Sequence, residues 1–272
     1  MKVVLFCGGY GMRLREYSET VPKPMVPIGD RPVLWHIMKY YAHFGHTEFI
    51  LCLGYQGNAI KRYFLDYDET ASNDFVMSNG GTDVDLMGCD IRDWKITFVD
   101  TGLRSPVGER LRRVRRFLQD DEMFLANYTD GLSDFHLPNL VDRVKESGAV
   151  GGFLAVRPPY SFHVVDVAPD GPVEAVRDLT QTDLRINGGY FAFRNEIFDY
   201  IEEGEELVLQ PFQRLIERGR MTSYSYDGFW TSMDTFKEKQ QLDDMYLRGE
   251  HPWALWKPDS SMLVPQEGAR TF

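Results

Sequence analysis

The stretch KVVLFCGGYGMRLREYSETVPKPMVPIGDRPVL, residues 2–34, decides the expected fold. Residues 2–7 are apolar after the lysine and stop at two glycines. Such a run is typical of a central parallel strand that is buried on both faces of a sheet. The glycines that follow favour a loop in which backbone amides approach a phosphate closely. By itself, however, this cluster is equally typical of a tight turn between a strand and a helix.

The rest of the first half alternates between helical and strand-like patterns. We expect helices over 31–45, 58–64 and 109–118 and strands over 48–55, 94–102 and 122–130. This order predicts an α/β fold with a Rossmann-like, mainly parallel mixed sheet that is flanked by helices. The ligand site of such a sheet lies beyond the carboxyl ends of its strands.

The second half is richer in strand patterns. Turn residues at Pro158-Pro159 and Asp170-Gly171 predict antiparallel strands added to the sheet, and 186–194 is a further strand candidate. Helices are expected from Asn195, as a possible N-cap, and over 233–249. We expect one domain over residues 1–256 and a tail at 257–272.

The composition narrows the classes of function. A hydrophobic content of 43% is enough for a sizeable core, and a net charge of -11 argues against general binding to nucleic acid or to an anionic membrane. No apolar run approaches the roughly 18 residues of a membrane span. The three cysteines are odd in number and lack metal or redox spacing, which favours a reducing cytoplasm.

Two cations accompany the glycines. Arg13 and Lys23 are spaced so that one loop can fold back over the same phosphates, where charge-assisted hydrogen bonds are strong. Pro22 and Pro24 hold the chain extended around Lys23. A dinucleotide-binding module is disfavoured, because the Gly-x-Gly-x-x-Gly spacing is missing and Gly54 follows the second strand where an acidic residue would stand.

Several motifs together resemble the sugar-1-phosphate nucleotidylyltransferases. GGYGMRL (8–14) and PKPMVPIGDRPVLWHIM (22–38) match the two signatures of that family in order and spacing. VDTG, RLRRV, INGGYF and GFWTSMDT are most similar to its glucose-1-phosphate cytidylyltransferase branch. The resemblance implies magnesium-dependent transfer of CMP from CTP to a sugar 1-phosphate with release of pyrophosphate, and subunits that form homo-oligomers.

The resemblance implies a nucleotide-binding part at about 1–135 and an acceptor-binding part at about 136–256. It also implies roles for single residues. Arg13 would meet the β and γ phosphates, and Lys23 would hold the α-phosphate. The residues implied to contact the nucleotide are Gly8, Gly9, Gly11, Met12, Thr101, Gly102, Gly108 and Arg110. Met12 stands where the family usually has threonine, so a hydroxyl is lost while the main-chain amide remains.

Asp130 and Asp234 are the implied magnesium ligands. Two carboxylates completed by phosphate oxygens and waters are a common way to hold this ion. Taken without the resemblance, each aspartate is more typical of a turn or a helix cap. Asp234 directly precedes a predicted helix, so capping and metal binding both remain open for it.

The acceptor side departs from the family pattern. Asn187 and Gly188 match the implied acceptor-binding Asn-Gly-Gly, but Leu179 stands where we place the family's phosphate-binding lysine, with Asp178 in place of the preceding glutamate. Three explanations are open. Arg177 or Arg185 replaces the lysine, the acceptor has changed, or the chain is a nucleotide-binding relative that has lost catalysis.

Overall fold

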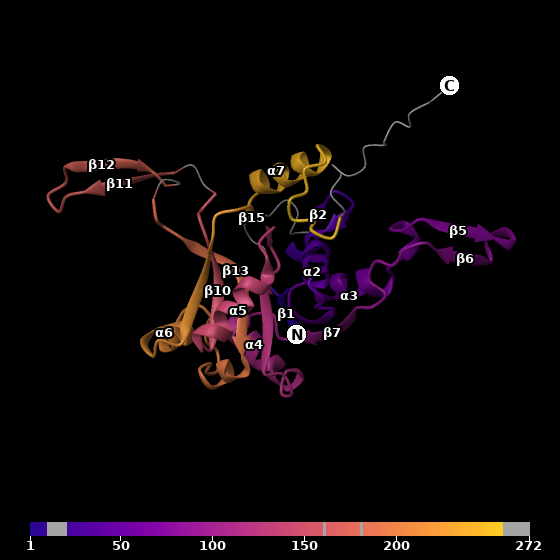
Figure 1. The fold of residues 1–272 in the computed structure, drawn as a ribbon, viewed down its shortest axis with the longest axis horizontal. Helices are drawn as coiled ribbons and strands as arrows, with labels where there is room; N and C mark the ends of the chain where they lie inside the picture. Colours follow the sequence, from indigo (N-terminus) through magenta and orange to yellow (C-terminus); the bar gives the residue numbers. More distant parts are fainter. Residues whose placement is uncertain (10–20, 160–161, 180–181, 258–272) are drawn as a thin grey trace, which may run out of the picture.

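A seven-stranded mixed sheet forms the body of the protein (Figure 1). The computed structural model describes residues 1–9, 21–159, 162–179 and 182–257. In spatial order the strands are β14 (Met221–Tyr226), β10 (Gly151–Val156), β13 (Ile186–Arg194), β8 (Met123–Tyr128), β1 (Val3–Phe6), β4 (Glu48–Leu53) and β7 (Lys95–Asp100). Among these seven strands, β13 alone runs antiparallel to its neighbours. The predicted α/β fold with a mainly parallel sheet is therefore confirmed.

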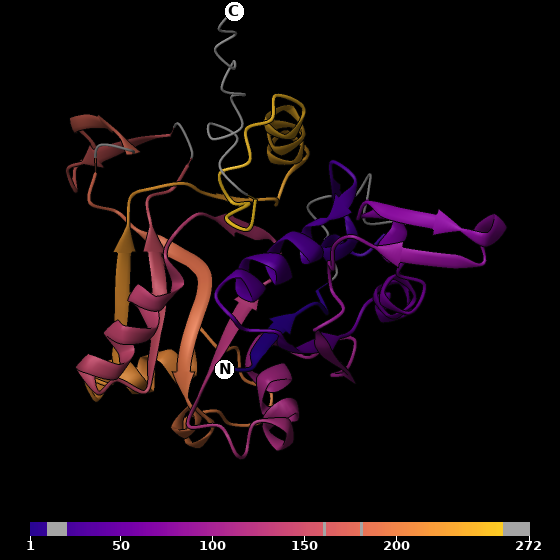
Figure 2. The same cartoon turned by 45° about the vertical axis from the view of Figure 1, so that its right-hand side comes forward.

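Helices cover both faces of the sheet, as the continuous apolar pattern of β1 requires. Val3 and Leu5 point into one core, and Val4 and Phe6 point into the other. The first core is covered by α2 (Val33–His43), α3 (Gly57–Leu65), α5 (Leu137–Ser147) and α7 (Phe236–Leu247). The second is covered by α4 (Val107–Val114) and α6 (Gln210–Glu217). Figure 2 shows α2 lying across the strands of the first face.

The parallel strands end along one edge, which is where the ligand site of such a sheet is expected. Because β13 runs the other way, its first residues lie at this same edge. Two short antiparallel strand pairs form small sheets separate from the main one. One consists of β2 (Pro27–Ile28) and β3 (Arg31–Pro32), and the other of β9 (Gly131–Ser133) and β15 (Trp230–Ser232). Further 3-10 helices span Lys23–Met25, Glu69–Ala71, Asn79–Gly81, Arg115–Phe117 and Asn195–Asp199.

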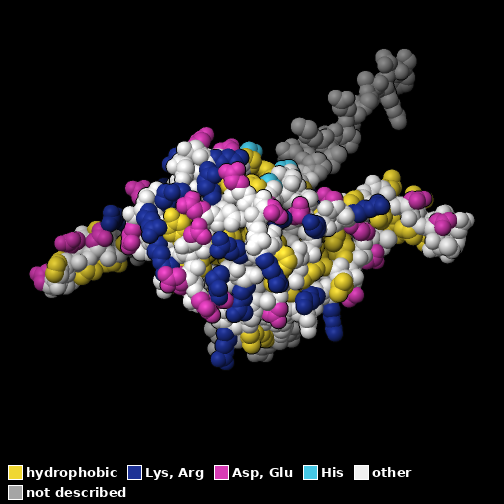
Figure 3. Space-filling model, turned by 90° about the horizontal axis from the view of Figure 1, so that it is seen from below, with side chains coloured by type: hydrophobic (Ala, Val, Ile, Leu, Met, Phe, Trp, Pro, Cys, Tyr) yellow, Lys and Arg dark blue, Asp and Glu magenta, His cyan; other side chains and the backbone are white. Residues whose placement is uncertain are grey.

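Two hairpins project from opposite sides of the body (Figure 1). One consists of β11 (His163–Val167) and β12 (Val173–Asp178), and its turn contains the predicted Asp170-Gly171. This pair forms a separate two-stranded sheet instead of extending the main one. The sequence did not lead us to expect the other hairpin, β5 (Phe75–Ser78) with β6 (Asp83–Leu86). Both hairpins carry hydrophobic side chains that are exposed outside the body (Figure 3).

One predicted helix start is wrong. Asn195 does not cap an α-helix, because residues 195–199 form a 3-10 helix whose N-cap position is Arg194. The Asn195 side-chain amide instead donates hydrogen bonds to the carbonyls of Leu118 and Asp121. In the part of the chain that the structure describes, no helix is long and apolar enough to cross a membrane.

Candidate active site

Lys23 lies between two aspartates at the carboxyl edge of the sheet. Its ammonium donates hydrogen bonds to Asp130 Oδ2 at 2.6 Å and to Asp234 Oδ1 at 2.7 Å. Lys23 opens a 3-10 helix between two prolines, Asp130 follows β8, and Asp234 follows β15. The structure thus brings together three predicted site residues that lie more than 100 positions apart in the chain.

The short pair of β9 and β15 keeps the two aspartates side by side. Gly131, directly after Asp130, pairs with Ser232. The backbone amide of Met233, directly before Asp234, then donates to the Asp130 carbonyl at 2.8 Å. Backbone hydrogen bonds therefore fix the spacing of the carboxylates before any ligand binds.

Helix capping is not the role of Asp234. The N-cap of α7 is Thr235, which forms a capping box with Glu238. Glu238 Oε2 also accepts a hydrogen bond from the Asp234 backbone amide at 2.7 Å. The capping interpretation is thus wrong, and the Asp234 carboxylate contacts Lys23 instead, while metal binding stays a prediction.

Lys23, Asp130 and Asp234, here called the Lys23 cluster, carry a net negative charge. Burial lowers the pKa of the Lys23 ammonium, but Asp130 and Asp234 outweigh that effect and hold the pKa above its ordinary value. Lys23 therefore stays charged at neutral pH. One ammonium against two carboxylates leaves a net charge of about one negative unit on these three side chains.

A cavity of about 290 Å³ opens beside the cluster. Gly8, Gly9, Lys23, Arg110 and Asp130, all predicted site residues, line it. The sequence interpretation missed the other lining residues: Phe6, Pro24, Leu103, Arg104, Ser105, Pro106, Val107, Tyr128, Thr129 and Glu206. A signal was present for the segment from Leu103 to Val107, because it joins the predicted VDTG and RLRRV motifs.

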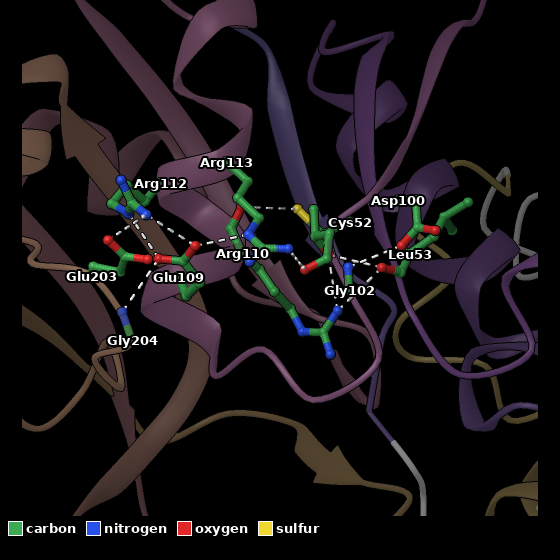
Figure 4. A network of polar contacts seen from close by, with 11 residues as sticks. Cys52, Leu53, Asp100, Gly102, Glu109, Arg110, Arg112, Arg113, Glu203 and Gly204 are labelled. Atoms are coloured by element: carbon green, nitrogen blue, oxygen red, sulfur yellow. Dashed lines mark hydrogen bonds and ion pairs between the residues drawn. The ribbon is translucent and has the colours of Figure 1, made fainter.

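Arg110 is a buried residue of the cavity wall, and it joins separate segments of the chain through hydrogen bonds (Figure 4). We call these contacts the Arg110 clamp. Its guanidinium donates to the Leu53 carbonyl at 3.1 Å, to Thr101 Oγ1 at 2.9 Å and to the Gly8 carbonyl at 3.0 Å. It thereby ties the ends of β1 and β4 to the loop after β7. Contact with the nucleotide stays a prediction for Arg110.

Three other predicted nucleotide contacts do not line the cavity. Thr101 is fully buried, and its hydroxyl donates to the Leu53 carbonyl at 2.8 Å. Gly102 has a φ of 89°, a left-handed conformation that favours glycine. A Cβ at Gly108 would come within 2.6 Å of the Glu205 carbonyl, so this glycine lets α4 pack closely. Gly11, Met12 and Arg13 lie outside the described residues.

The predicted acceptor residues lie at two places. Asn187 and Gly188 are the second and third residues of β13, and the Gly188 carbonyl accepts a hydrogen bond from Trp230 Nε1 at 2.9 Å. Asp178 ends β12 at the base of its hairpin. The next residue, Leu179, is buried, and its backbone amide donates to the Phe162 carbonyl at 2.8 Å.

Comparison with known proteins identifies the family. The model of the family described as nucleotidyl transferase matches residues 2–237. The chain belongs to the nucleotidyl transferase family. A probable glucose-1-phosphate cytidylyltransferase of Bacillus subtilis is 35% identical over 94% of this chain and 100% of its own length. The glucose-1-phosphate cytidylyltransferase of Salmonella typhimurium is 36% identical with the same coverage. The predicted family and enzyme class, a nucleotidyltransferase, are confirmed.

Solved structures support the fold of this transferase. A UDP-glucose pyrophosphorylase complexed with UDP-glucose superposes with a TM-score of 0.65, at 15% identity, over 91% of this chain and 98% of its own. HddC from Yersinia pseudotuberculosis gives a TM-score of 0.64 at 16% identity, over 90% and 99% of the two chains. At such low identity, the likeness concerns the fold alone.

Replacing Gly8 of the transferase by alanine will disturb the Arg110 clamp. The new Cβ would come within 2.0 Å of Arg110 Nη1, and the buried guanidinium would have to leave its carbonyl partners. We expect a loss of about 1–3 kcal/mol in the free energy of unfolding, measured by urea denaturation. Gly9→Ala is the matched control, because nothing lies within 4 Å of a Cβ there. Equal losses in both variants would contradict this role of Arg110.

A second network at the start of α4 predicts sensitivity to acid (Figure 4). Arg112 and Arg113 both bind Glu109. Hydrogen bonds from Arg112, then from Arg113 and the Gly204 amide, lower the pKa of Glu109 to about 2 against the effect of burial.

The stabilisation from Glu109 is therefore present above about pH 4.5, its ordinary pKa, and is lost as the pH falls toward 2. We expect the wild type to lose about 2 kcal/mol more than Glu109→Gln over this interval, as measured by urea unfolding at each pH. Parallel pH profiles of the two proteins would refute the assignment.

Proposed function

We propose that this transferase moves CMP from CTP to a sugar 1-phosphate, with glucose 1-phosphate as the favoured acceptor, and releases pyrophosphate. The observation that carries the proposal is the position of Lys23 between Asp130 and Asp234, beside a cavity lined by Gly8 and Gly9. The names of the relatives from Bacillus subtilis and Salmonella typhimurium support the choice of CTP and of glucose 1-phosphate.

In this reaction an oxygen of the acceptor phosphate attacks the α-phosphorus of the nucleotide. Both reactants are anions, so the site must neutralise them and hold the attacking and leaving oxygens in line. Lys23 would bind the α-phosphate oxygens as their charge grows, and the backbone amides of the Gly8 loop would bind the nucleotide phosphates. Arg13 would bind the β and γ phosphates.

The two aspartates fit a magnesium ion. In the described part of the chain, no group of three or more His, Cys, Asp or Glu side chains could hold a metal by itself. Asp130 and Asp234 would supply two ligands, and phosphate oxygens and waters the rest, as magnesium prefers. The negative charge of the Lys23 cluster would repel a triphosphate, which favours a further cation there. When bound, magnesium would neutralise phosphate charge and help to orient the nucleotide.

We also propose that two parts of the chain bind the two substrates. Residues 1–135 would bind the nucleotide and 136–256 the acceptor, with Asp178, Asn187 and Gly188 on the acceptor side. Nucleotide binding would also involve Thr101, Gly102, Gly108 and Arg110. For the first three residues this role would be indirect, since they do not line the cavity.

A homo-oligomer in the cytoplasm is the proposed state of the protein. Exposed apolar residues on the two hairpins, such as Met77 and Val173, support association, because isolated two-stranded hairpins are marginally stable in water. Sedimentation velocity would test it, and a monomer at micromolar concentration would overturn it. The odd number of cysteines supports the reducing compartment.

Pyrophosphate release tests the proposed activity. CTP, UTP, dTTP, GTP and ATP are each incubated with magnesium and glucose 1-phosphate, and then with other phosphorylated acceptors. We expect release with CTP and glucose 1-phosphate above all other pairs. Release with CTP and another phosphate only would mean that the acceptor has changed. No release from any pair would contradict catalysis.

A further inference from the structure

Two arginines share one carboxylate at the ends of three adjacent strands. Arg157 follows β10, Asp227 follows β14, and Arg185 precedes β13. Arg157 Nε donates to Asp227 Oδ1 at 2.9 Å, and Arg185 Nη2 donates to Oδ1 at 3.0 Å and to Oδ2 at 3.2 Å. Residues from three parts of the chain thus converge on one point of the carboxyl edge.

Backbone carbonyls orient both guanidinium groups. Arg185 Nη1 donates to the carbonyls of Ala155 at 3.3 Å and Tyr226 at 3.2 Å. Arg157 Nη1 donates to the carbonyl of Thr182 at 2.6 Å. Because these contacts are already made, neither side chain has to be ordered when a ligand arrives.

The charge of this group suits an anion. Two guanidinium groups and one carboxylate sum to one positive charge, and the Asp227 side chain is 60% exposed to solvent. Its carboxylate accepts hydrogen bonds from one nitrogen of each guanidinium group, Arg157 Nε and Arg185 Nη2, and a phosphate oxygen would fit the same two donors. A phosphate could therefore bind at this point once the exposed carboxylate moves aside.

The position also suits an acceptor. Ala155 pairs with Asn187 across β10 and β13, so the arginines lie within two residues of the predicted acceptor motif. Gly188 follows, and a Cβ on Gly131, the neighbour of Asp130, would lie 3.6 Å from the Gly188 carbonyl. The strand that carries this motif, β13, lies between β10, which Arg157 follows, and β8, which Asp130 follows.

We propose that Arg157 and Arg185 bind the phosphate of the sugar 1-phosphate. They would replace the family's phosphate-binding lysine, at whose position this chain has Leu179. This inference rests on the proposed function. Leu179 is apolar and buried, and Arg177 pairs with Asp166 on the β11–β12 hairpin. Arg177 lies on this projecting hairpin, whereas Arg157 and Arg185 lie at the edge of the main sheet.

Steady-state kinetics of Arg157→Met and Arg185→Met test the proposal, with Arg177→Met as the matched control. Loss of a hydrogen bond to a charged group costs roughly 10- to 100-fold, so we expect the KM for glucose 1-phosphate to rise by that factor in the first two variants. The KM for CTP should change less than about twofold, and Arg177→Met should behave as wild type. Arg185→Lys, which keeps a point charge, should show a smaller rise.

Thermal denaturation shows whether each variant is folded. If Arg185→Met does not fold, Arg185→Lys takes its place in the kinetic comparison. Unchanged acceptor KM values in folded variants of both arginines would overturn the proposal, as would equal increases for both substrates. Failure of the proposed function is a separate result, because the wild type would then release no pyrophosphate. In that case calorimetric binding of glucose 1-phosphate, with CTP present and magnesium absent, still compares the arginine variants with the control.

Discussion

Replacing Lys23 by methionine will lower kcat for CMP transfer by about 10³-fold. The ammonium is held at 2.6 and 2.7 Å by two carboxylates, so it is already in place where charge develops in the transition state. A methionine of similar length removes the charge and leaves Asp130 and Asp234 to repel each other. Pyrophosphate release under saturating CTP and glucose 1-phosphate measures the effect.

Lys39→Met is the control for this variant. Lys39 is buried to the same degree as Lys23, with side-chain exposures of 16% and 15%, and it also binds an aspartate, Asp90. It lines a different cavity, beside Trp35 and Trp256. We expect similar losses of thermal stability in both variants but loss of turnover in Lys23→Met alone. A folded Lys23→Met enzyme with nearly wild-type kcat would remove Lys23 from the mechanism.

Asp130→Asn and Asp234→Asn will each reduce kcat/KM by roughly 10²- to 10³-fold. Each change removes one negative charge from the pair that we propose to hold magnesium, while the shape of the side chain is kept. The magnesium concentration for half-maximal rate should rise by at least about tenfold in both variants. Titration of the initial rate with magnesium chloride measures this shift.

Asp90→Asn is the matched control, because Asp90 also pairs with a lysine but lies at the other cavity. Its magnesium dependence should equal that of the wild type. If Asp130→Asn and Asp234→Asn kept the wild-type magnesium dependence, the two aspartates would be partners of Lys23 only, and the metal would have to bind elsewhere.

The body of the fold could be predicted because its elements carry strong local patterns. The continuous apolar run of β1 indicates burial on both faces, and Val3 and Val4 do point into different cores. Likewise, the spacing of Leu34, Ile37 and Met38 predicts α2, in which all three are fully buried. In both elements the apolar residues are the ones that neighbouring layers of the structure bury.

The β5–β6 hairpin was missed, because its first strand lacks the pattern of a strand that packs on a core. Phe75, Val76 and Met77 are consecutive apolar residues, and all three are exposed. Alternation of apolar and polar residues arises when one face of a strand packs on a core, and this hairpin projects away from the core (Figure 1). A signal was nevertheless present in the turn, because Asn79-Gly80 is typical of a hairpin and Asp83–Leu86 alternates between polar and apolar residues.

The glycine loop and Lys23 could be proposed from the residues themselves, but Asp130 and Asp234 were accessible only through resemblance. Asp130 and Asp234 come together because β9 and β15, strands of three residues each, pair with each other. Elements this short carry too little periodicity to be recognised. Similarly, the Arg110 clamp depends on carbonyls at the ends of β1 and β4, which no local pattern connects to α4.

Transfer of label from CTP to a sugar tests the central claim most directly. The enzyme is incubated with CTP labelled at the α-phosphorus, glucose 1-phosphate and magnesium, and the products are separated by chromatography. The account predicts label in CDP-glucose, dependent on magnesium and lost in Lys23→Met. Label that stays in CTP, or that appears only in CMP through hydrolysis, would contradict nucleotidyl transfer to this acceptor.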